Sequence, residues 1–271
     1  MSRDPESGVS LLNVLVVVAA ASGLVQVMLS GQQSAVSEVA QAQDVAQAEA
    51  LARSGVASVA VALRRDMVEA PKADHLQEDW ARAAQQAVTF DAGSFAVEVS
   101  DPRGRFNINS LTAGAFLEQR IFMGLLNALD LPETLASQIA VHLQAAGPLR
   151  DPRALIASGV SQADLTRLLP HIVAVETPGP INLNTATQPV LAAVLSNPSA
   201  SQALVARRKG RGFLDREDFR ALGVLVPPAA GFTSDTFDVS TEANVGTARR
   251  NVKRRIHRDA ERGTLTILPL E

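Results

Sequence analysis

The feature that most constrains this chain is an uncharged, mostly apolar run of 21 residues from Val9 to Leu29. A helix of that length spans about 31 Å, which matches the hydrocarbon core of a bilayer. A cleaved secretory signal has a basic start, a shorter apolar segment and then a small-residue cleavage site. Here the leader MSRDPESG carries one Arg against an Asp and a Glu, and its small residue, Gly8, precedes the run. We therefore expect the run to be retained as a transmembrane helix.

The chain that follows this run is polar, rich in Ala, Gln and Glu, and free of proline until Pro71. These residues favour helix, so we expect one helix from about Val9 to about Met67 with its first third in the membrane. Arg3 is the only basic residue before Arg53, which places the short N-terminus in the cytoplasm and the larger C-terminal part outside it. A plain signal anchor would share this topology.

Composition narrows the classes of function. The formal net charge is −3, which gives the whole chain no electrostatic bias toward nucleic acid. The absence of cysteine excludes a disulfide framework and Cys-ligated metal sites. None of the four histidines has zinc-site spacing, and the chain has no G-x-S-x-G, P-loop or Rossmann fingerprint. We interpret the histidines as surface or structural residues and expect no enzyme; they are His75, His142, His171 and His257.

Alternating apolar and polar residues predict strands on both sides of a central block. The segment AVTFDAGSFAVEVSD predicts a hairpin whose strands meet at Ala92-Gly93, with Phe95, Val97 and Val99 on one face. Near the C-terminus, DTFDVSTEANV, ARRNVKRRIHRD and GTLTILPL read as three further strands. Because an isolated hairpin is only marginally stable, we expect the two groups of strands to pair with each other.

The central block, residues 106–226, is rich in helix signals and contains an internal repeat. FNINSL at 106–111 matches INLNTA at 181–186, and each is followed by an apolar helix, a second helix, a Gly turn and a short helix ending in Gly-Val. Asp151 and Asp215 read as N-caps, and Asp218 completes a capping box with Asp215. The asparagines of each N-x-N pair are expected to bond local backbone at the entry to the helices.

Two other patterns invite a binding interpretation. DPRGRFNINS starts like an acidic calcium loop, but Arg103 and Arg105 stand where ligands should be, so it is no EF-hand. The second copy of the repeat resembles a helix-hairpin-helix unit, which holds DNA phosphate on the backbone amides of a Gly-rich turn. The corresponding turns, LDLPETL and LSNPSAS, contain no glycine, and Pro132 and Pro198 each remove an amide.

A basic run extends from Arg249 to Arg258 and contains six Lys or Arg residues. We interpret it as a solvated edge strand that is protected from aggregation by charge. The alternative is a surface that contacts an acidic partner protein.

Several segments together carry a family resemblance. They are Gly8 before a retained apolar helix, SGVSLLNVLVVV, the single Trp80 before VTFDAGSFAVEVSDPRGRFNINSL, and PGPINLNTATQPVLAAVL. Over essentially the whole chain, the sequence resembles the general secretion pathway protein K family, the large minor pseudopilins of type II secretion. The pair GRFNIN and INLNTA around a helical insert is its most specific part.

The resemblance implies an α+β fold, in which a long N-terminal helix packs on an antiparallel sheet as in pseudopilins and type IV pilins. Combined with the patterns above, it divides the chain into four parts. Residues 1–8 form a cleaved leader, and residues 9–29 form the transmembrane part of the helix. Residues 30–105 and 227–271 form the pseudopilin core. Residues 106–226 form an inserted all-α domain with two helix-hairpin-helix-like repeats.

The resemblance also implies a place in an assembly. It implies cleavage between Gly8 and Val9 by prepilin peptidase, N-methylation of Val9, and a location in the bacterial inner membrane with the C-terminal part in the periplasm. Its implied partners are two other minor pseudopilins at the pseudopilus tip, the major pseudopilin and the inner-membrane assembly platform. Calcium is bound in part of the family, and no motif in this sequence places its ligands. The open alternative is a membrane-anchored helix-hairpin-helix protein that binds DNA during uptake.

Asn13 is the fifth residue of the expected mature chain, where most pilins and pseudopilins carry a glutamate. That glutamate is thought to neutralise the N-terminal ammonium of a neighbouring subunit, because an unpaired charge in a bilayer is costly. An asparagine cannot supply this charge. We therefore expect this chain to start or cap the fibre, with a glutamate lost by drift as the alternative.

Overall fold

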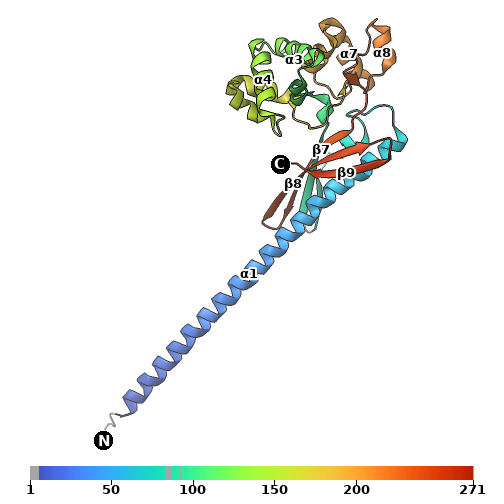
Figure 1. Ribbon diagram of the computed structural model, residues 1–271. Coiled ribbons are helices and arrows are strands. Elements are labelled where there is room, and N and C mark those ends of the chain that lie inside the picture. Colours follow the sequence, from blue (N-terminus) through green and yellow to red (C-terminus); the bar gives the residue numbers. More distant parts are fainter. Residues whose placement is uncertain (1–5, 83–86, 92, 271) are drawn as a thin grey trace.

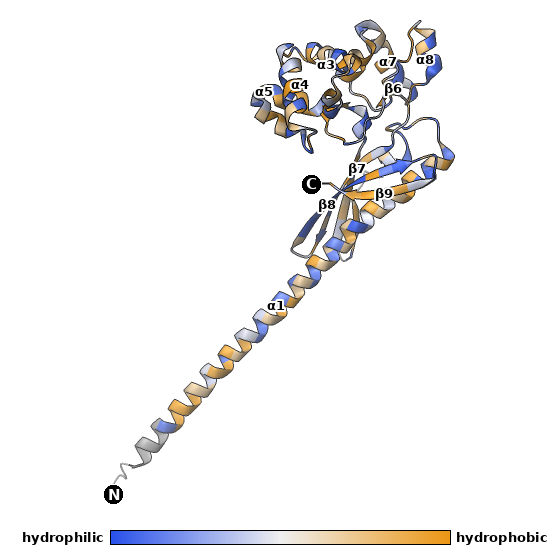
Figure 2. Ribbon diagram, in the orientation of Figure 1, coloured by the Kyte–Doolittle hydropathy of each residue, from blue (hydrophilic) through white to orange (hydrophobic). Residues whose placement is uncertain are grey.

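The computed structural model describes residues 6–82, 87–91 and 93–270, and a long N-terminal helix dominates its shape (Figure 1). Helix α1 runs over Glu6–Glu69, so the predicted helix from about Val9 to about Met67 is confirmed with slightly wider ends. The helix stands free over most of its length, and only its C-terminal part lies along the sheet (Figure 1). Its apolar N-terminal part is the orange segment of Figure 2, and it is long and apolar enough to cross a membrane.

The sheet has five strands, and every neighbouring pair is antiparallel. Its order is β1-β2-β7-β8-β9, with strands Val88–Phe90, Gly93–Ser100, Thr236–Val245, Ala248–Asp259 and Thr264–Pro269. The predicted hairpin and the three predicted C-terminal strands are confirmed, although Ala92 lies outside the described residues. The predicted pairing across the central block is confirmed by the β2–β7 ladder.

The helix and the sheet share one hydrophobic core. Helix α1 contributes a stripe spaced by three or four residues, which is the period of one helix face; it consists of Ala48, Ala52, Val56, Val59 and Leu63. Phe237 of β7 meets Trp80 edge-to-face at 5.0 Å between ring centroids. Trp80 belongs to the short helix α2, Asp79–Arg82. Gly55 brings the helix against β7, because a Cβ there would lie 2.5 Å from Thr241 Cγ2.

The chain between β2 and β7 folds into a separate helical part, drawn above the sheet in Figure 1. Its α-helices are α3 Phe116–Ala128, α4 Thr134–Ala146, α5 Gln162–Leu168, α6 Gln188–Leu195, α7 Pro198–Arg211 and α8 Arg216–Ala221. This part also contains four 3₁₀ helices: η2 Pro102–Gly104, η3 Ile108–Ala113, η4 Pro152–Ser158 and η5 Leu169–His171. The large buried side chains of this part, such as Phe122, Ile139 and Phe219, form a core distinct from the core under the sheet.

This helical part is not all-α as expected. Two short parallel strand pairs lie within it, β3 Phe106–Asn107 with β4 Ile172–Val173, and β5 Ile181–Asn182 with β6 Ala230–Gly231. Each pair joins the start of one repeat copy to the chain that leaves that copy. The extra pairing arises because the N-x-N segment of each copy lies extended before its first helix, which leaves backbone groups to be satisfied.

The repeat is visible in matching hydrogen bonds. Asn107 and Asn182 each accept a bond from the backbone N–H two residues later, so the expected local bonding is confirmed for the first asparagine of each pair. For the second asparagine of each pair it is wrong. The second asparagines accept from a distant backbone N–H, Asn109 from Leu149 at 2.8 Å and Asn184 from Leu214 at 2.6 Å. Each asparagine therefore anchors the loop that precedes the capped helix of its own copy. The helix-hairpin-helix identity of the copies stays a prediction.

The capping predictions are confirmed. Asp151 caps η4 through Arg153 N, and Asp215 caps α8. Asp215 accepts from Asp218 N while Asp218 accepts from Asp215 N, which is a complete capping box.

The interpretation of the basic run as a solvated edge strand is wrong for its second half. Strand β8 pairs with β7 from Ala248 to His257 and also with β9 from Arg254 to Asp259. Strand β9 is therefore the outer strand there, and Arg258 is buried at 6% exposure. The alternation of side chains could not reveal this, because a buried arginine that ends an ion-pair network has the same sequence pattern as an exposed one.

Candidate functional site at the joint

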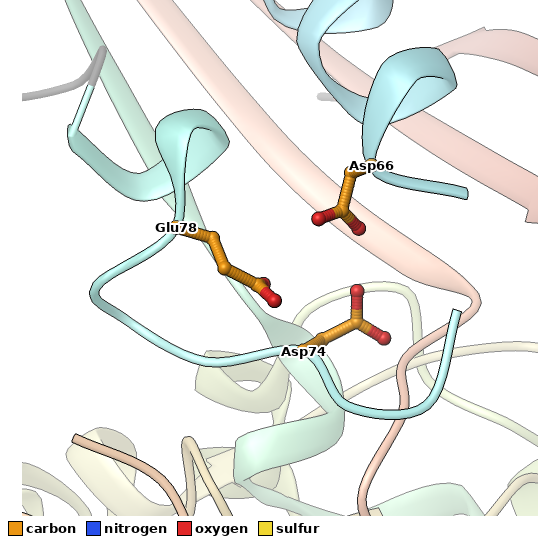
Figure 3. Close-up of side chains that lie close together, drawn as sticks. All are labelled: Asp66, Asp74 and Glu78. Carbon is orange, nitrogen blue, oxygen red and sulfur yellow. The ribbon is translucent and has the colours of Figure 1, made fainter. Parts of the chain in front are cut away.

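Three carboxylates converge where the end of α1 meets the loop that leads to α2 (Figure 3). Asp66 comes from the last turn of α1, and Asp74 and Glu78 come from the loop. One carboxylate oxygen of each residue lies within 4.8 Å of the other two. The fold brings three carboxyl groups together in a largely buried place, with side-chain exposures of 9%, 1% and 9%.

Arg258 of β8 is the cation that faces this cluster. Its guanidinium donates to Asp66 Oδ2 at 2.8 Å and also to Asp74 Oδ2. It also donates to the backbone carbonyl of Ser234 and lies over the ring of Phe237, 5.0 Å from the centroid. Arg258 thus holds one oxygen of Asp66 and one oxygen of Asp74.

The remaining oxygens are unequally satisfied. Glu78 Oε2 accepts from His75 N at 2.9 Å and from Trp80 Nε1 at 2.7 Å. Asp74 Oδ2 accepts from Ser234 N at 2.6 Å in addition to Arg258. Asp74 Oδ1 is buried and has no hydrogen-bond partner among the described residues. A buried acceptor in this state costs free energy unless something else binds it.

The electrostatics of the cluster are unfavourable as it stands. Burial, together with repulsion from Glu78 and Asp74, raises the pKa of Asp66 to about 7 although Arg258 opposes the shift. Burial also raises the pKa of Glu78. Burial lowers the pKa of His75, although the charge of Asp74 opposes this shift, and the charged form of this neighbouring imidazole is therefore disfavoured. One guanidinium therefore faces three carboxylates.

A second polar network continues from this cluster into the helical part. Asp101 Oδ2, at the end of β2, accepts from Asn182 Nδ2, Thr185 Oγ1 and Ser234 Oγ. Asn182 Nδ2 also reaches the carbonyl of Asp74 at 3.0 Å. Burial raises the pKa of Asp101, and the hydrogen bonds that it accepts oppose this shift. These contacts tie the helical part, the loop before α2 and the sheet into one joint.

A cavity of about 330 Å³ opens beside the joint. Its wall includes Arg103, Asp235, Met67 and Arg258. Arg103 is buried and bonds both oxygens of Asp235, at 2.7 and 3.0 Å. Arg258, which bonds the carboxylates of Asp66 and Asp74, thus also lines this cavity.

The joint is a place of structural ion pairing, and its three acids are also close enough together that they could hold a metal ion. A Ca²⁺ ion takes oxygen ligands at about 2.3–2.6 Å, so oxygens on opposite sides of it are about 4.6–5.2 Å apart. The spacing of up to 4.8 Å among Asp66, Asp74 and Glu78 fits that requirement. The second oxygens of Asp66 and Asp74 are held by Arg258, and such outer bonds are typical of carboxylates that ligate metals.

Sequence reasoning did not find this cluster. Arg258 and Asp66 are 192 positions apart, and no local spacing links the three acids to each other. The residues that the sequence did single out lie elsewhere. Gly8 and Val9 lie in the first turns of α1, and Asn13 is exposed on the same free end of the helix. The structure therefore separates the expected processing and assembly residues from the joint by almost the length of α1 (Figure 1).

Some groups of the second repeat copy that a DNA phosphate would need are bonded within the protein. Arg207 and Arg211 of α7 pair with Asp218. In the turn between α6 and α7, the N–H groups of Ser196, Ala200 and Ser201 bond acceptors within the protein. These two cations and these three backbone donors are thus already engaged within the protein.

The comparisons with known proteins agree with one another. The family model described as "Type II secretion system (T2SS), protein K" matches residues 181–240. Type II secretion system protein K of Pseudomonas aeruginosa is 30% identical over 255 residues, covering 80% of this chain and 77% of that protein. A chain in the crystal structure of the GspK-GspI-GspJ complex from enterotoxigenic Escherichia coli has a TM-score of 0.64 at 18% identity. That match covers 85% of this chain and 97% of the other, and it shows a shared fold.

Proposed function

The chain belongs to the type II secretion system protein K family, and we propose that this minor pseudopilin starts or caps the pseudopilus from its tip. The observation that carries the proposal is the position of the helical part, beyond the sheet at the end of α1 farthest from the N-terminus (Figure 1). A subunit stacked above along the fibre axis would meet this bulk. The helical part therefore favours a position with no subunit above it.

Asn13 supports the same position from the other end of the molecule. It lies exposed in the apolar segment of α1, where it can form hydrogen bonds but carries no charge. A subunit with a glutamate at this position gains an electrostatic partner in the ammonium of a subunit already in the fibre. Because this chain lacks that attraction, it docks best where nothing precedes it.

The N-terminal end of α1 supports processing and anchoring. We propose that prepilin peptidase cleaves between Gly8 and Val9 and that Val9 is then N-methylated. The apolar segment that follows is long enough for a single-pass anchor. With Arg3 on the cytoplasmic side, the sheet and the helical part face the periplasm. The protein works by assembly, as a non-enzymatic component.

The proposed partners follow from the family and the related complex. The E. coli structure contains GspK with GspI and GspJ, so we propose that this chain joins two other minor pseudopilins in a tip complex. The complex would sit on the major pseudopilin and be built by the inner-membrane assembly platform. The long free stretch of α1 offers exposed apolar residues to neighbouring helices, among them Val36 and Val39.

Two experiments test this proposal. Intact mass and N-terminal sequencing of membrane-extracted protein should give a mature start at N-methylated Val9. Gly8→Val should leave the leader in place, and the matched control Gly23→Val, at a glycine with open space around it, should be cleaved normally. A start at Met1 or near Gly31 in the wild-type protein would refute the processing step.

The position in the fibre is tested by cross-linking. Wild-type protein should cross-link to tip subunits only, and Asn13→Glu should shift a fraction of it into the shaft. Wild-type protein found repeatedly along the shaft would refute the tip assignment. If Asn13→Glu remains at the tip with normal secretion, the helical part alone sets the position.

A further inference from the structure

We propose that the open edge of β8 between Ala248 and Lys253 accepts an extended, acidic segment of a partner protein as an additional strand. The added strand would lie in line with β9 and beyond its end. The inference concerns a contact made by the sheet, and it does not depend on the position of the chain in the fibre.

The register of the sheet leaves this edge open. Strand β8 has 12 residues, whereas β9 has only 6. Strand β7 pairs with β8 from Ala248 to His257, but β9 pairs with it only from Arg254 to Asp259. Among the described residues, no strand lies on the β9 side of residues 248–252. The β7–β8 hairpin therefore extends beyond the end of β9 (Figure 1).

Two hydrogen bonds show which backbone groups point to the open side. In an antiparallel strand, the N–H and C=O of one residue point to the same side, and successive residues alternate. Arg258 N donates at 2.6 Å to the residue that precedes β7, and Lys253 O accepts at 3.4 Å from the residue that follows β9. The odd-numbered residues of β8 therefore face the β9 side. At the open edge, these are Arg249 and Asn251.

The side chains at this edge are basic and only partly paired. Arg250 and Lys253 are exposed, and neither forms an ion pair in the part of the chain that the structure describes. Arg254 donates to the Lys253 carbonyl at 2.8 Å, and Arg249 pairs with Glu242 at 2.5 Å. Because side chains alternate between the two faces of a strand, the edge carries positive charge on both faces.

These charges select the occupant. A second copy of the chain would bring the same cations against this edge, and like charges opposite each other in a sheet are destabilising. An acidic strand avoids this repulsion. Its backbone pairs with Arg249 and Asn251, and its carboxylates meet Arg250 and Lys253. Strand addition takes its affinity from backbone bonds and its specificity from alternate side chains, so the partner segment should carry acidic residues on both faces.

The test uses the full chain in a nonionic detergent and a fluorescent peptide, Glu-Val-Thr-Glu-Glu-Val-Thr-Glu. As a strand, this peptide has glutamates on both faces, and we expect saturable binding by fluorescence anisotropy. The control peptide has the same charge but carries proline in place of the first valine and the second threonine. It should bind at least about tenfold more weakly, because it lacks an N–H on each of its two edges.

Variants of the chain separate the open edge from general electrostatics. Arg250→Glu and Lys253→Glu should each weaken binding of the glutamate peptide by about tenfold or more. Lys209→Glu makes the same change of charge at an exposed residue of α7 and should bind as the wild type does. Asn251→Pro removes an N–H only on the open side, where a strand tolerates proline. It should also weaken binding about tenfold, with a thermal unfolding midpoint close to that of the wild type.

Residue-resolved hydrogen exchange locates the contact. In the free chain, the amides of Arg249 and Asn251 should exchange faster than those of Arg250 and Val252, which face β7. The glutamate peptide should slow exchange at the first two residues only. Slower exchange there at higher concentration of the chain alone would mean that a second copy occupies the edge, and this result would overturn the proposal.

Three results of the binding experiments would also overturn it. The first is the absence of saturable binding by wild-type protein up to about 1 mM glutamate peptide. The second is equal binding of the proline peptide, which would mean that charge alone attracts the peptide. The third is a loss for Lys209→Glu as large as that for Arg250→Glu, which would place the contact elsewhere or nowhere in particular.

Discussion

Replacing Asn182 by alanine tests how the helical part is joined to the sheet. Asn182 is 0% exposed. Its Nδ2 atom lies 3.0 Å from the Asp74 carbonyl, 3.0 Å from Asp101 Oδ2 and 2.9 Å from Ser234 Oγ. Its Oδ1 atom accepts from Asn184 N at 3.0 Å. Asn182→Ala removes all of these bonds from a place that is closed to solvent.

The expected magnitude follows from the groups that are left unpaired. The Asp74 carbonyl and the Asn184 N–H each lose the partner described above, and a buried polar group without a partner costs about 1–3 kcal/mol. Asp101 keeps its bonds from Thr185 and Ser234, so its ionised form loses only one of the side-chain hydrogen bonds that stabilise it. We therefore expect the free energy of unfolding to fall by about 4 kcal/mol in total.

The assay is urea unfolding of the full chain in detergent, followed by Trp80 fluorescence and by far-UV circular dichroism. Trp80 reports on the core under the sheet, and circular dichroism reports mainly on the helices. Both transitions should move to lower urea concentration, because Asn182 lies in the helical part and bonds Asp74 and Asp101 outside its core. The matched control is Asn197→Ala, an exposed N-cap of α7, which should cost only about 1 kcal/mol. A loss for Asn182→Ala no larger than for this control would refute the reasoning.

Three further predictions concern separate parts of the molecule. Burial raises the pKa of Asp235, but the hydrogen bond and charge of Arg103 outweigh it and the net pKa is lowered. The resulting stability is present above about pH 4 and is lost as the pH falls, so urea midpoints of wild type and Asp235→Asn should converge in acid; a constant gap would contradict this. Gly55→Val should cost about 1–3 kcal/mol in fluorescence-detected unfolding, because a Cβ there would lie 2.5 Å from a methyl carbon of β7. Gly31→Val, in open space, should not change it. Phe122→Ala should cost about 3–5 kcal/mol and shift the circular dichroism transition more than the fluorescence transition; equal shifts would mean that the two cores unfold as one.

Much of the fold could be predicted because its signals are local. Alternation along β2 and β7, the absence of proline in α1 and the caps at Asp151 and Asp215 each depend on a few neighbouring residues. The pairing of β2 with β7 followed from the instability of an isolated hairpin. The repeat predicted the bonding of Asn107 and Asn182, since similar sequences at similar places satisfy the same backbone groups.

The joint could not be predicted because its residues meet only after the whole chain has folded. Arg258 lies in a run of basic residues, and nothing nearby distinguishes it from the exposed Arg250. Asp74 lies in a loop without a motif. Its burial depends on Ser234 and Asn182, which arrive from distant segments. Burial and charge at such a place are set by tertiary contacts, and the periodicity of apolar and polar residues in the sequence does not indicate them.

The position of β7 in the sheet has a consequence for the order in which the molecule can form. The partner of strand β2 follows the whole helical part in the sequence, since Ser100 pairs with Asp238. Closing a chain of about 130 residues costs roughly 3 kcal/mol more than closing one of about five. The helical part has its own core, and its two ends meet where Ser234 Oγ donates to Asp101 Oδ2 at 2.6 Å. Once the helical part has folded, only a short loop remains to be closed before β2 and β7 pair. Folding of the helical part then controls how fast the sheet forms. A substitution in the core of the helical part would therefore slow the pairing of β2 with β7 without changing either strand.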